Sequence, residues 1–182
     1  MQSALLLVVP AAEAAVGPHR IRLDRSARDG VPAHLTVLYP FLRPAEIGPD
    51  VLAELSRLFA TAPRFSFTLD RVRWFDQSVV WVGPSDESPF RALTALASAA
   101  YPSCLPYGGE HPDPVPHLTI GHGGDLTELR AAAEAVRPLL PIPTEATEVT
   151  LMAGPDPARP PVPPGPAEPP GRWQRVASFP LG

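Results

Sequence analysis

The sequence predicts an α+β fold in which two similar lobes, with antiparallel-rich sheets, surround a central cleft. The first observation is a repeat, because the segment 32–41 (PAHLTVLYPF) is matched by the segment 115–122 (VPHLTIGH). The second is the order of the expected elements, which nearly recurs in the second half of the chain. One copy of the repeat therefore falls in each lobe.

Both copies contain His, an aliphatic residue, Thr and an aliphatic residue, in a run typical of a strand. Residues i and i+2 of a strand point to the same face. His34 and Thr36 therefore share one face, and His117 and Thr119 share the corresponding face of the second strand. The aliphatic residues anchor each strand in a core, so the two strands can present two imidazoles and two hydroxyls to one cleft.

The other elements follow from local patterns. Apolar runs and alternation predict strands at residues 5–9, 65–69 with a continuation or bend at 72–75, 79–82, 145–152 and 173–179. Helical spacing and capping residues predict helices at 11–16, at 49–60, from Ser88 onward, and at 125–136 behind Asp125. Gly17-Pro18 interrupts the first of these, and residues 19–25 are expected to form a second helical piece or an extended arm. Dense proline and glycine predict loops at 101–116 and 155–171.

Length and composition indicate a single domain over residues 1–182. The repeat divides it into lobes of roughly 1–84 and 85–182, and we allow for an exchange of terminal strands between them. Hydrophobic residues make up 45% of the chain, which is enough for a packed core. The net charge of −4 argues against a general polyanion binder and favours a small nucleotide or an RNA terminus as substrate.

The single cysteine, Cys104, has no basic neighbour to favour a thiolate, so we expect it to be structural. No apolar run reaches the length of a membrane span, and the short run near the N-terminus lacks the basic residues of a signal peptide. We therefore expect a cytoplasmic protein that does not bind membranes, and a monomer.

Two imidazoles that face each other suit acid–base chemistry at phosphorus. The pKa of histidine lies near neutrality, so one ring can accept a proton while the other donates one. The threonine hydroxyls can hold non-bridging phosphate oxygens as charge builds on them. Three arginines shortly before the first motif, within residues 19–25, could also reach a phosphate. This chemistry requires no metal and no cofactor.

The two motifs and the closing segment resemble those of a known family. The motifs PAHLTVLYPF and VPHLTIGHG, with the closing segment RWQRVASFPLG, are similar to those of the two-histidine (2H) phosphoesterase superfamily and its LigT-like 2′-5′ RNA ligase branch. The resemblance implies a bilobal LigT-like fold and metal-independent hydrolysis of 2′,3′-cyclic phosphates to 2′-phosphates, with reversible 2′-5′ RNA ligation in some members. It also implies that His34 and Thr36 of one lobe act with His117 and Thr119 of the other, with His34 as general acid and His117 as general base.

Three further residues are candidate substrate contacts. Many relatives carry a basic residue just after the second motif, and here that residue is His122. Strict alternation places His122 on the face opposite His117, although the neighbouring glycines can bend the strand. Tyr107, in a glycine-flanked loop, and Tyr39 are candidates for contact with a base, whereas we expect Phe41 and Trp81 to pack in the core.

Two alternatives remain open. The first alternative is a metal site, formed by residues that lie close in sequence: His111, Asp113, His117 and His122. Their spacing matches no zinc signature, and a metal site there would leave the repeated motif at His34 unexplained. A non-catalytic RNA or nucleotide binder on the same fold is the second alternative.

Overall fold

The computed structural model describes residues 1–111, 113–156 and 172–182. The predicted Pro-rich loop, apart from residues 155 and 156, lies outside the described residues. The strands are β1 (Gln2–Val8), β2 (His34–Leu38), β3 (Phe65–Phe75), β4 (Val79–Pro84), β5 (Leu118–His122), β6 (Ile142–Ala146), β7 (Glu148–Gly154) and β8 (Gln174–Pro180). The helices are α1 (Glu13–Leu23), α2 (Arg25–Arg28), α3 (Pro49–Phe59), α4 (Ser88–Ala100) and α5 (Leu126–Val136).

The strands form two four-stranded antiparallel sheets, which confirms the α+β fold with two lobes. The first sheet, in the order β2-β1-β7-β8, combines the two ends of the chain. The second sheet, in the order β5-β4-β3-β6, comes from the middle of the chain. Each sheet has one strand of the repeat, β2 or β5, at its edge.

The two sheets do not divide the chain at the predicted lobe boundary of residues 84 and 85. β3 and β4 precede that boundary, yet they form one sheet with β5 and β6. The reason is a hairpin: β3 pairs with β4 along most of its length, so these two strands cannot be separated into different sheets. β7 and β8, from the second half of the chain, return to the sheet of β1 and β2.

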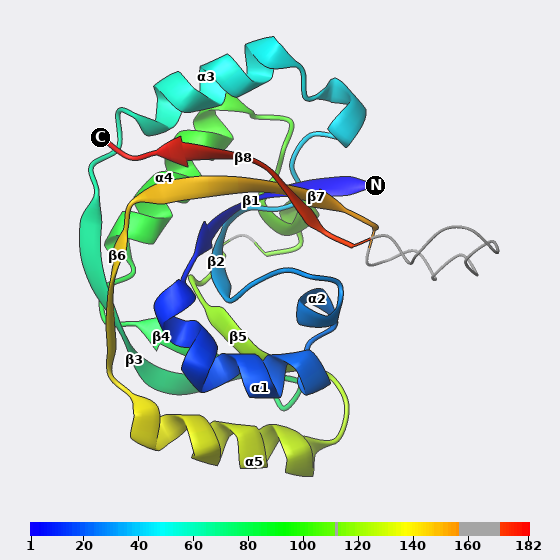
Figure 1. Ribbon diagram of the computed structural model, residues 1–182, viewed down its shortest axis with the longest axis vertical. Helices are drawn as coiled ribbons and strands as arrows, with labels where there is room; N and C mark the ends of the chain where they lie inside the picture. Colours follow the sequence, from blue (N-terminus) through cyan, green and yellow to red (C-terminus); the bar gives the residue numbers. More distant parts are fainter. Residues whose placement is uncertain (112, 157–171) are drawn as a thin grey trace, which may run out of the picture.

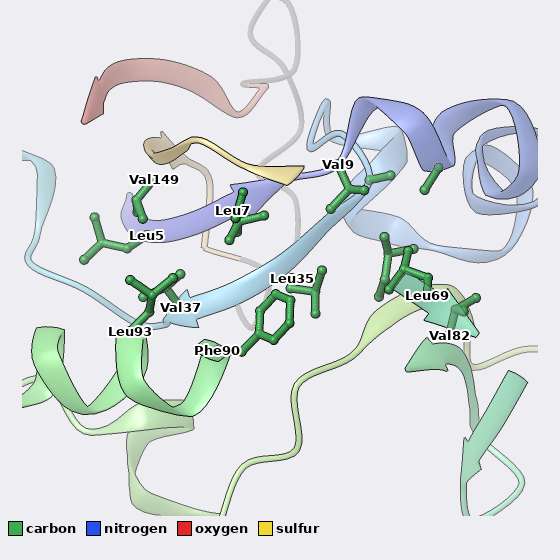
Figure 2. Close-up of a cluster of buried hydrophobic side chains, with 14 of the residues drawn as sticks. Leu5, Leu7, Val9, Leu35, Val37, Leu69, Val82, Phe90, Leu93 and Val149 are labelled. Atoms are coloured by element: carbon green, nitrogen blue, oxygen red, sulfur yellow. The ribbon is translucent and has the colours of Figure 1, made fainter. Parts of the chain in front are cut away.

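Helices from both halves of the chain cover each sheet (Figure 1). α4 packs on β2 and α3 on β8, so both cover the first sheet, whereas α1 and α5 cover β5 of the second sheet. Figure 2 shows Leu35 and Val37 of β2 beside Phe90 and Leu93 of α4. All four side chains are buried, and for Leu35 and Val37 the alternation of the repeat predicts this.

Two predicted elements were wrong in extent. α1 continues through Gly17-Pro18 to Leu23, although Pro18 lacks the N–H that a helix interior requires. Burial of Ala15 and Val16 against the core offsets that loss, since helix stability in proteins comes largely from packing.

The predicted strand 145–152 is two strands. β6 ends at Ala146 and pairs with β3, whereas β7 begins at Glu148 and pairs with β1. Thr147 is thus the point at which the chain passes from one sheet to the other, and alternation alone cannot detect such a crossing.

Candidate active site

Both copies of the repeat line one cavity of about 550 Å³. Its lining residues include all seven that the sequence singled out: His34, Thr36, Tyr39, Tyr107, His117, Thr119 and His122. Along β2 the residues of the repeat alternate as predicted, with His34 and Thr36 half-buried and Leu35 and Val37 buried. The same alternation holds for His117, Thr119 and the aliphatic residues between and after them.

A β-bulge occurs at the same place in each copy of the repeat. In β2, Leu38 pairs with Leu5 and Thr36 pairs with Leu6, so Val37 is the extra residue. A bulge of this kind lets two successive residues point to one side, and the alternation resumes one residue out of step. Val37 and Leu38 are accordingly both buried, and Tyr39 returns to the face of Thr36.

The bulge in β5 brings His122 into the cavity. Gly121 pairs with Val80 and Thr119 with Trp81, which leaves Ile120 as the extra residue. Ile120 and Gly121 are both buried, while His122 is exposed and lines the cavity beside Thr119. Strict alternation from His117 therefore gave the wrong face for His122. Tyr39 and His122 occupy equivalent positions in the two copies of the repeat.

The two candidate catalytic rings are held by the same kind of backbone contact. Nδ1 of His34 lies 2.7 Å from the carbonyl oxygen of Pro32, and Nδ1 of His117 lies 2.7 Å from that of Val115. A carbonyl only accepts, so Nδ1 carries the hydrogen and the neutral ring keeps an unprotonated Nε2. Nε2 of both rings can therefore accept a proton or, once protonated, donate one.

The surroundings favour the neutral form of His34. Burial lowers the pKa of His34 to about 4, and the positive charge of Arg20 acts in the same direction. The hydrogen bond to Pro32 and the negative charge of Asp24 oppose this effect. His117 also lowers the pKa of His34, so the two rings interact electrostatically. An anionic phosphate in the cavity would stabilise a proton on either ring.

Aromatic rings surround His117. Its ring centroid lies 5.0 Å from that of Phe75, 5.9 Å from that of Trp81 and 6.4 Å from that of Tyr107. Burial accordingly lowers the pKa of His117, and the charges of His122 and His111 act in the same direction. Trp81 is buried, as predicted, and it also packs against the imidazole.

Tyr107 lines the cavity and contacts residues of both motifs. Its backbone N–H donates to the carbonyl oxygen of Tyr39 at 2.6 Å, and its side chain shares a hydrogen bond with Thr36. Its φ of 51° is left-handed, and Gly108 and Gly109 follow with φ of 65° and 82°. The loop thus turns sharply in a conformation that glycine adopts readily, which directs Tyr107 at the first motif.

The three arginines ahead of the first motif lie in different environments. Arg20 is buried and donates from Nε and Nη2 to Oδ2 of Asp24, at 3.2 and 2.9 Å. Arg22 is exposed and pairs with Glu128, whereas Arg25 lines the cavity. Of these three candidate phosphate contacts, Arg25 alone lies at the cavity.

Two other aromatic residues, Phe41 and Trp74, lie away from the cavity. Phe41 is buried in the core as predicted, and Trp74 lines a different groove beside α5. Trp173, by contrast, lines the cavity and was missed. The sequence assigned it only to a strand, and nothing in its local pattern links it to the histidines.

Cys104 is buried, and burial raises the pKa of its thiol, as expected of a structural residue. Within residues 1–111, 113–156 and 172–182, no three His, Cys, Asp or Glu residues are grouped so that they could hold a metal ion. The helices of the same residues include none long and apolar enough to span a membrane.

The fold and the cavity define a class: two-lobed α+β proteins in which each lobe contributes a His-x-Thr strand to a shared site. The model of the 2′-5′ RNA ligase superfamily matches residues 8–156, and the chain belongs to that family. No curated protein sequence matches the chain at a significant level.

Solved structures agree on the fold. The chain is similar to E. coli LigT complexed with 3′-AMP, with 20% identity, a TM-score of 0.58, and coverage of 99% of this chain and 97% of LigT. It is also similar to TT0787 of Thermus thermophilus, with 19% identity, a TM-score of 0.66, and coverage of 100% and 98%. E. coli LigT complexed with NADP+ gives 23% identity, a TM-score of 0.56, and coverage of 99% and 96%. The LigT-like bilobal fold of the 2H phosphoesterases is thus shared along almost the whole chain.

Proposed function

We propose that this protein is a metal-independent phosphodiesterase that hydrolyses a 2′,3′-cyclic phosphate, on a nucleotide or an RNA end, to a 2′-phosphate. The observation that carries the proposal is the convergence of His34 and His117 on one cavity, each with its Nδ1 tied to a carbonyl and Nε2 left available. Two groups that can each hold or release a proton are what in-line displacement at phosphorus requires. E. coli LigT binds 3′-AMP and other nucleotides in the same fold, which is consistent with a nucleotide-sized substrate.

The proposed reaction takes one step. His117 accepts a proton from water as its oxygen attacks phosphorus, and the bond between phosphorus and O3′ breaks. His34 donates its proton to O3′, which leaves a 2′-phosphate and a free 3′-hydroxyl. Arg20 and burial lower the pKa of His34 and so make its protonated form a stronger acid toward the leaving oxygen.

The hydroxyls stabilise the phosphate. Thr36 and Thr119 flank the histidines and can donate to the non-bridging oxygens, where negative charge increases in the transition state. Tyr39 and His122, returned to the cavity by the two bulges, lie at equivalent positions on either side and are the proposed outer contacts. A 5′-hydroxyl that attacks phosphorus in place of water would give 2′-5′ ligation, with His117 taking its proton and His34 again protonating O3′. Cleavage of a 2′-5′ linkage by the 3′-hydroxyl is the reverse reaction, and there the two histidines exchange roles.

The test is hydrolysis of cytidine 2′,3′-cyclic phosphate, and of a short RNA that ends in a cyclic phosphate, in the presence of EDTA. We expect multiple turnovers and a product that is the 2′-phosphate, resolved from the 3′ isomer by phosphorus NMR. Loss of activity on addition of EDTA would contradict the metal-independent mechanism. Binding of these ligands without turnover would instead favour a nucleotide-binding protein on the same fold.

A further inference from the structure

The cavity continues past the histidines along the first sheet. Besides the two motifs, it is lined by apolar residues and by one large aromatic residue from the other end of the chain: Ala4, Leu6, Val31 and Trp173. Together with Met152 these residues form a small buried cluster, separate from the main core, against which Tyr39 packs. One end of the cavity is therefore apolar, and the other holds the histidines.

The strand register shows where the apolar end of the cavity lies relative to the motif on β2. Leu6 of β1 pairs with Thr36 of β2, and Gln2 of β1 pairs with Gly154 of β7. Neighbouring strands lie about 4.8 Å apart, so β7 is about 10 Å across the sheet from β2. Trp173 packs on Gly154, level with Gln2 of β1, whereas His34 pairs with Val8 of the same strand, so Trp173 is displaced from His34 both across and along the sheet.

Trp173 is fixed in position by two contacts. A Cβ on Gly154 would lie only 2.4–2.6 Å from three ring atoms of Trp173, so the indole rests directly on the backbone of β7. The backbone N–H of Trp173 donates to the carbonyl oxygen of Asp29 at 2.7 Å. The ring centroid of Tyr39 lies 6.4 Å from that of Trp173. A pre-positioned aromatic surface of this kind favours contact with a flat ring.

The charged side chains that line the cavity are Asp24, Arg25 and Asp29. Asp24 is buried and already accepts bonds from Arg20 and Ser26. The side chain of Asp29 is 28% exposed, and its Oδ2 lies 3.4 Å from Nε of Arg25. A carboxylate has two acceptor oxygens, so Asp29 can accept a further hydrogen bond.

We propose that this end of the cavity, formed by Trp173, Tyr39 and Asp29, is the subsite for the nucleobase of the substrate. The base contacts the indole, and an exocyclic amino group of the base donates to the carboxylate of Asp29. The subsite selects substrates whose reacting phosphate lies on the same ribose as the base, and it prefers an amino-bearing base to uracil. This inference rests on the proposed function for the direction in which the phosphate lies.

The test is equilibrium binding, which does not require turnover. Calorimetry would compare cytidine 2′-monophosphate, uridine 2′-monophosphate and methyl riboside 2-phosphate, which lacks a base, on wild type, Trp173→Leu, Trp173→Phe and Asp29→Asn. We expect Trp173→Leu to weaken binding of the cytidine ligand about tenfold, as loss of a base–aromatic contact does, and to leave the base-free ligand unchanged. Trp173→Phe keeps an aromatic surface and should retain most of the affinity.

Asp29→Asn separates recognition of the base edge from aromatic contact. The 4-amino group of cytosine donates, whereas the 4-oxo group of uracil accepts, so wild type should prefer the cytidine ligand by about tenfold. The amide of asparagine both donates and accepts, and the preference should fall to near unity. Wild type that binds all three ligands equally, or that binds none of them, overturns the subsite, as does a Trp173→Leu variant that loses affinity for the base-free ligand to the same degree. Nucleotide binding by a wild type that cannot hydrolyse the cyclic phosphate would instead refute the proposed function and leave the subsite standing.

Discussion

Replacement of His34 or His117 by alanine is expected to lower kcat for cyclic phosphate hydrolysis by about 10²–10⁴-fold each, the usual contribution of a positioned acid or base. Both rings face the same cavity, and the charge of His117 acts on the pKa of His34. Because both protons move in one step, the double variant should be little slower than either single variant. His19→Ala provides the control, since His19 lies on α1 and is not among the residues that line the cavity.

Loss of either threonine hydroxyl is expected to lower kcat less than loss of a histidine. Thr36→Val and Thr119→Val keep the shape of the side chain and remove only the hydroxyl, and we expect about 10- to 100-fold lower kcat. Steady-state kinetics on protein with unchanged circular dichroism measures all of these effects. An active His34→Ala or His117→Ala variant, within tenfold of wild type, would contradict the assignment of the two histidines.

Replacement of Asp24 by alanine is expected to destabilise the fold by about 3–5 kcal/mol, the cost of leaving a buried charge without its partner. The side chains of Arg20 and Asp24 are only 2% and 7% exposed, and the guanidinium donates twice to Oδ2 of the carboxylate. Asp24 also caps α2, because its Oδ1 accepts from the backbone N–H of Ser26 at 2.9 Å. Its loss removes both interactions at the start of the segment that leads into the first motif.

Urea unfolding of Asp24→Ala against Glu128→Ala would measure this effect. Arg22 of α1 and Glu128 of α5 also form an ion pair, but their side chains are 64% and 50% exposed, and such pairs contribute about 0–1 kcal/mol. Replacing both buried charges, with Arg20→Met and Asp24→Leu, should recover much of the lost stability. Equal destabilisation by Asp24→Ala and Glu128→Ala would refute the account of this ion pair.

The sequence was most informative where one short-range rule decides the outcome. The period of two along a strand correctly put Leu35 and Val37 in the core and His34 and Thr36 on the opposite face. A capping residue likewise marked the start of α5, where Asp125 accepts from the backbone N–H of Thr127. The repeat was sufficient to expect both motifs at one cleft.

The features that sequence reasoning missed depend on contacts between distant segments. The bulges that return Tyr39 and His122 to the cavity are visible only in the pairing of β2 with β1 and of β5 with β4. Trp173 reaches the cavity because β8 pairs with β7, and β7 pairs with β1. No local pattern in the sequence reports which strands become neighbours, so neither feature could be derived from the motifs alone.

The most direct test of the two-histidine account is the pH dependence of kcat/KM for cytidine 2′,3′-cyclic phosphate. This parameter reports the pKa values of the free enzyme, and the account requires one protonated and one neutral imidazole. The pKa values of His34 and His117 are both lowered in the free protein, that of His34 to about 4. Above the ordinary histidine pKa near 6.5 both rings are therefore neutral, and the acid is missing.

The account therefore predicts a bell-shaped profile with its maximum below about pH 6.5, which falls on the alkaline side as the acid loses its proton and on the acid side as the base gains one. A profile that rises to a plateau above about pH 7, or that does not change with pH, would contradict it.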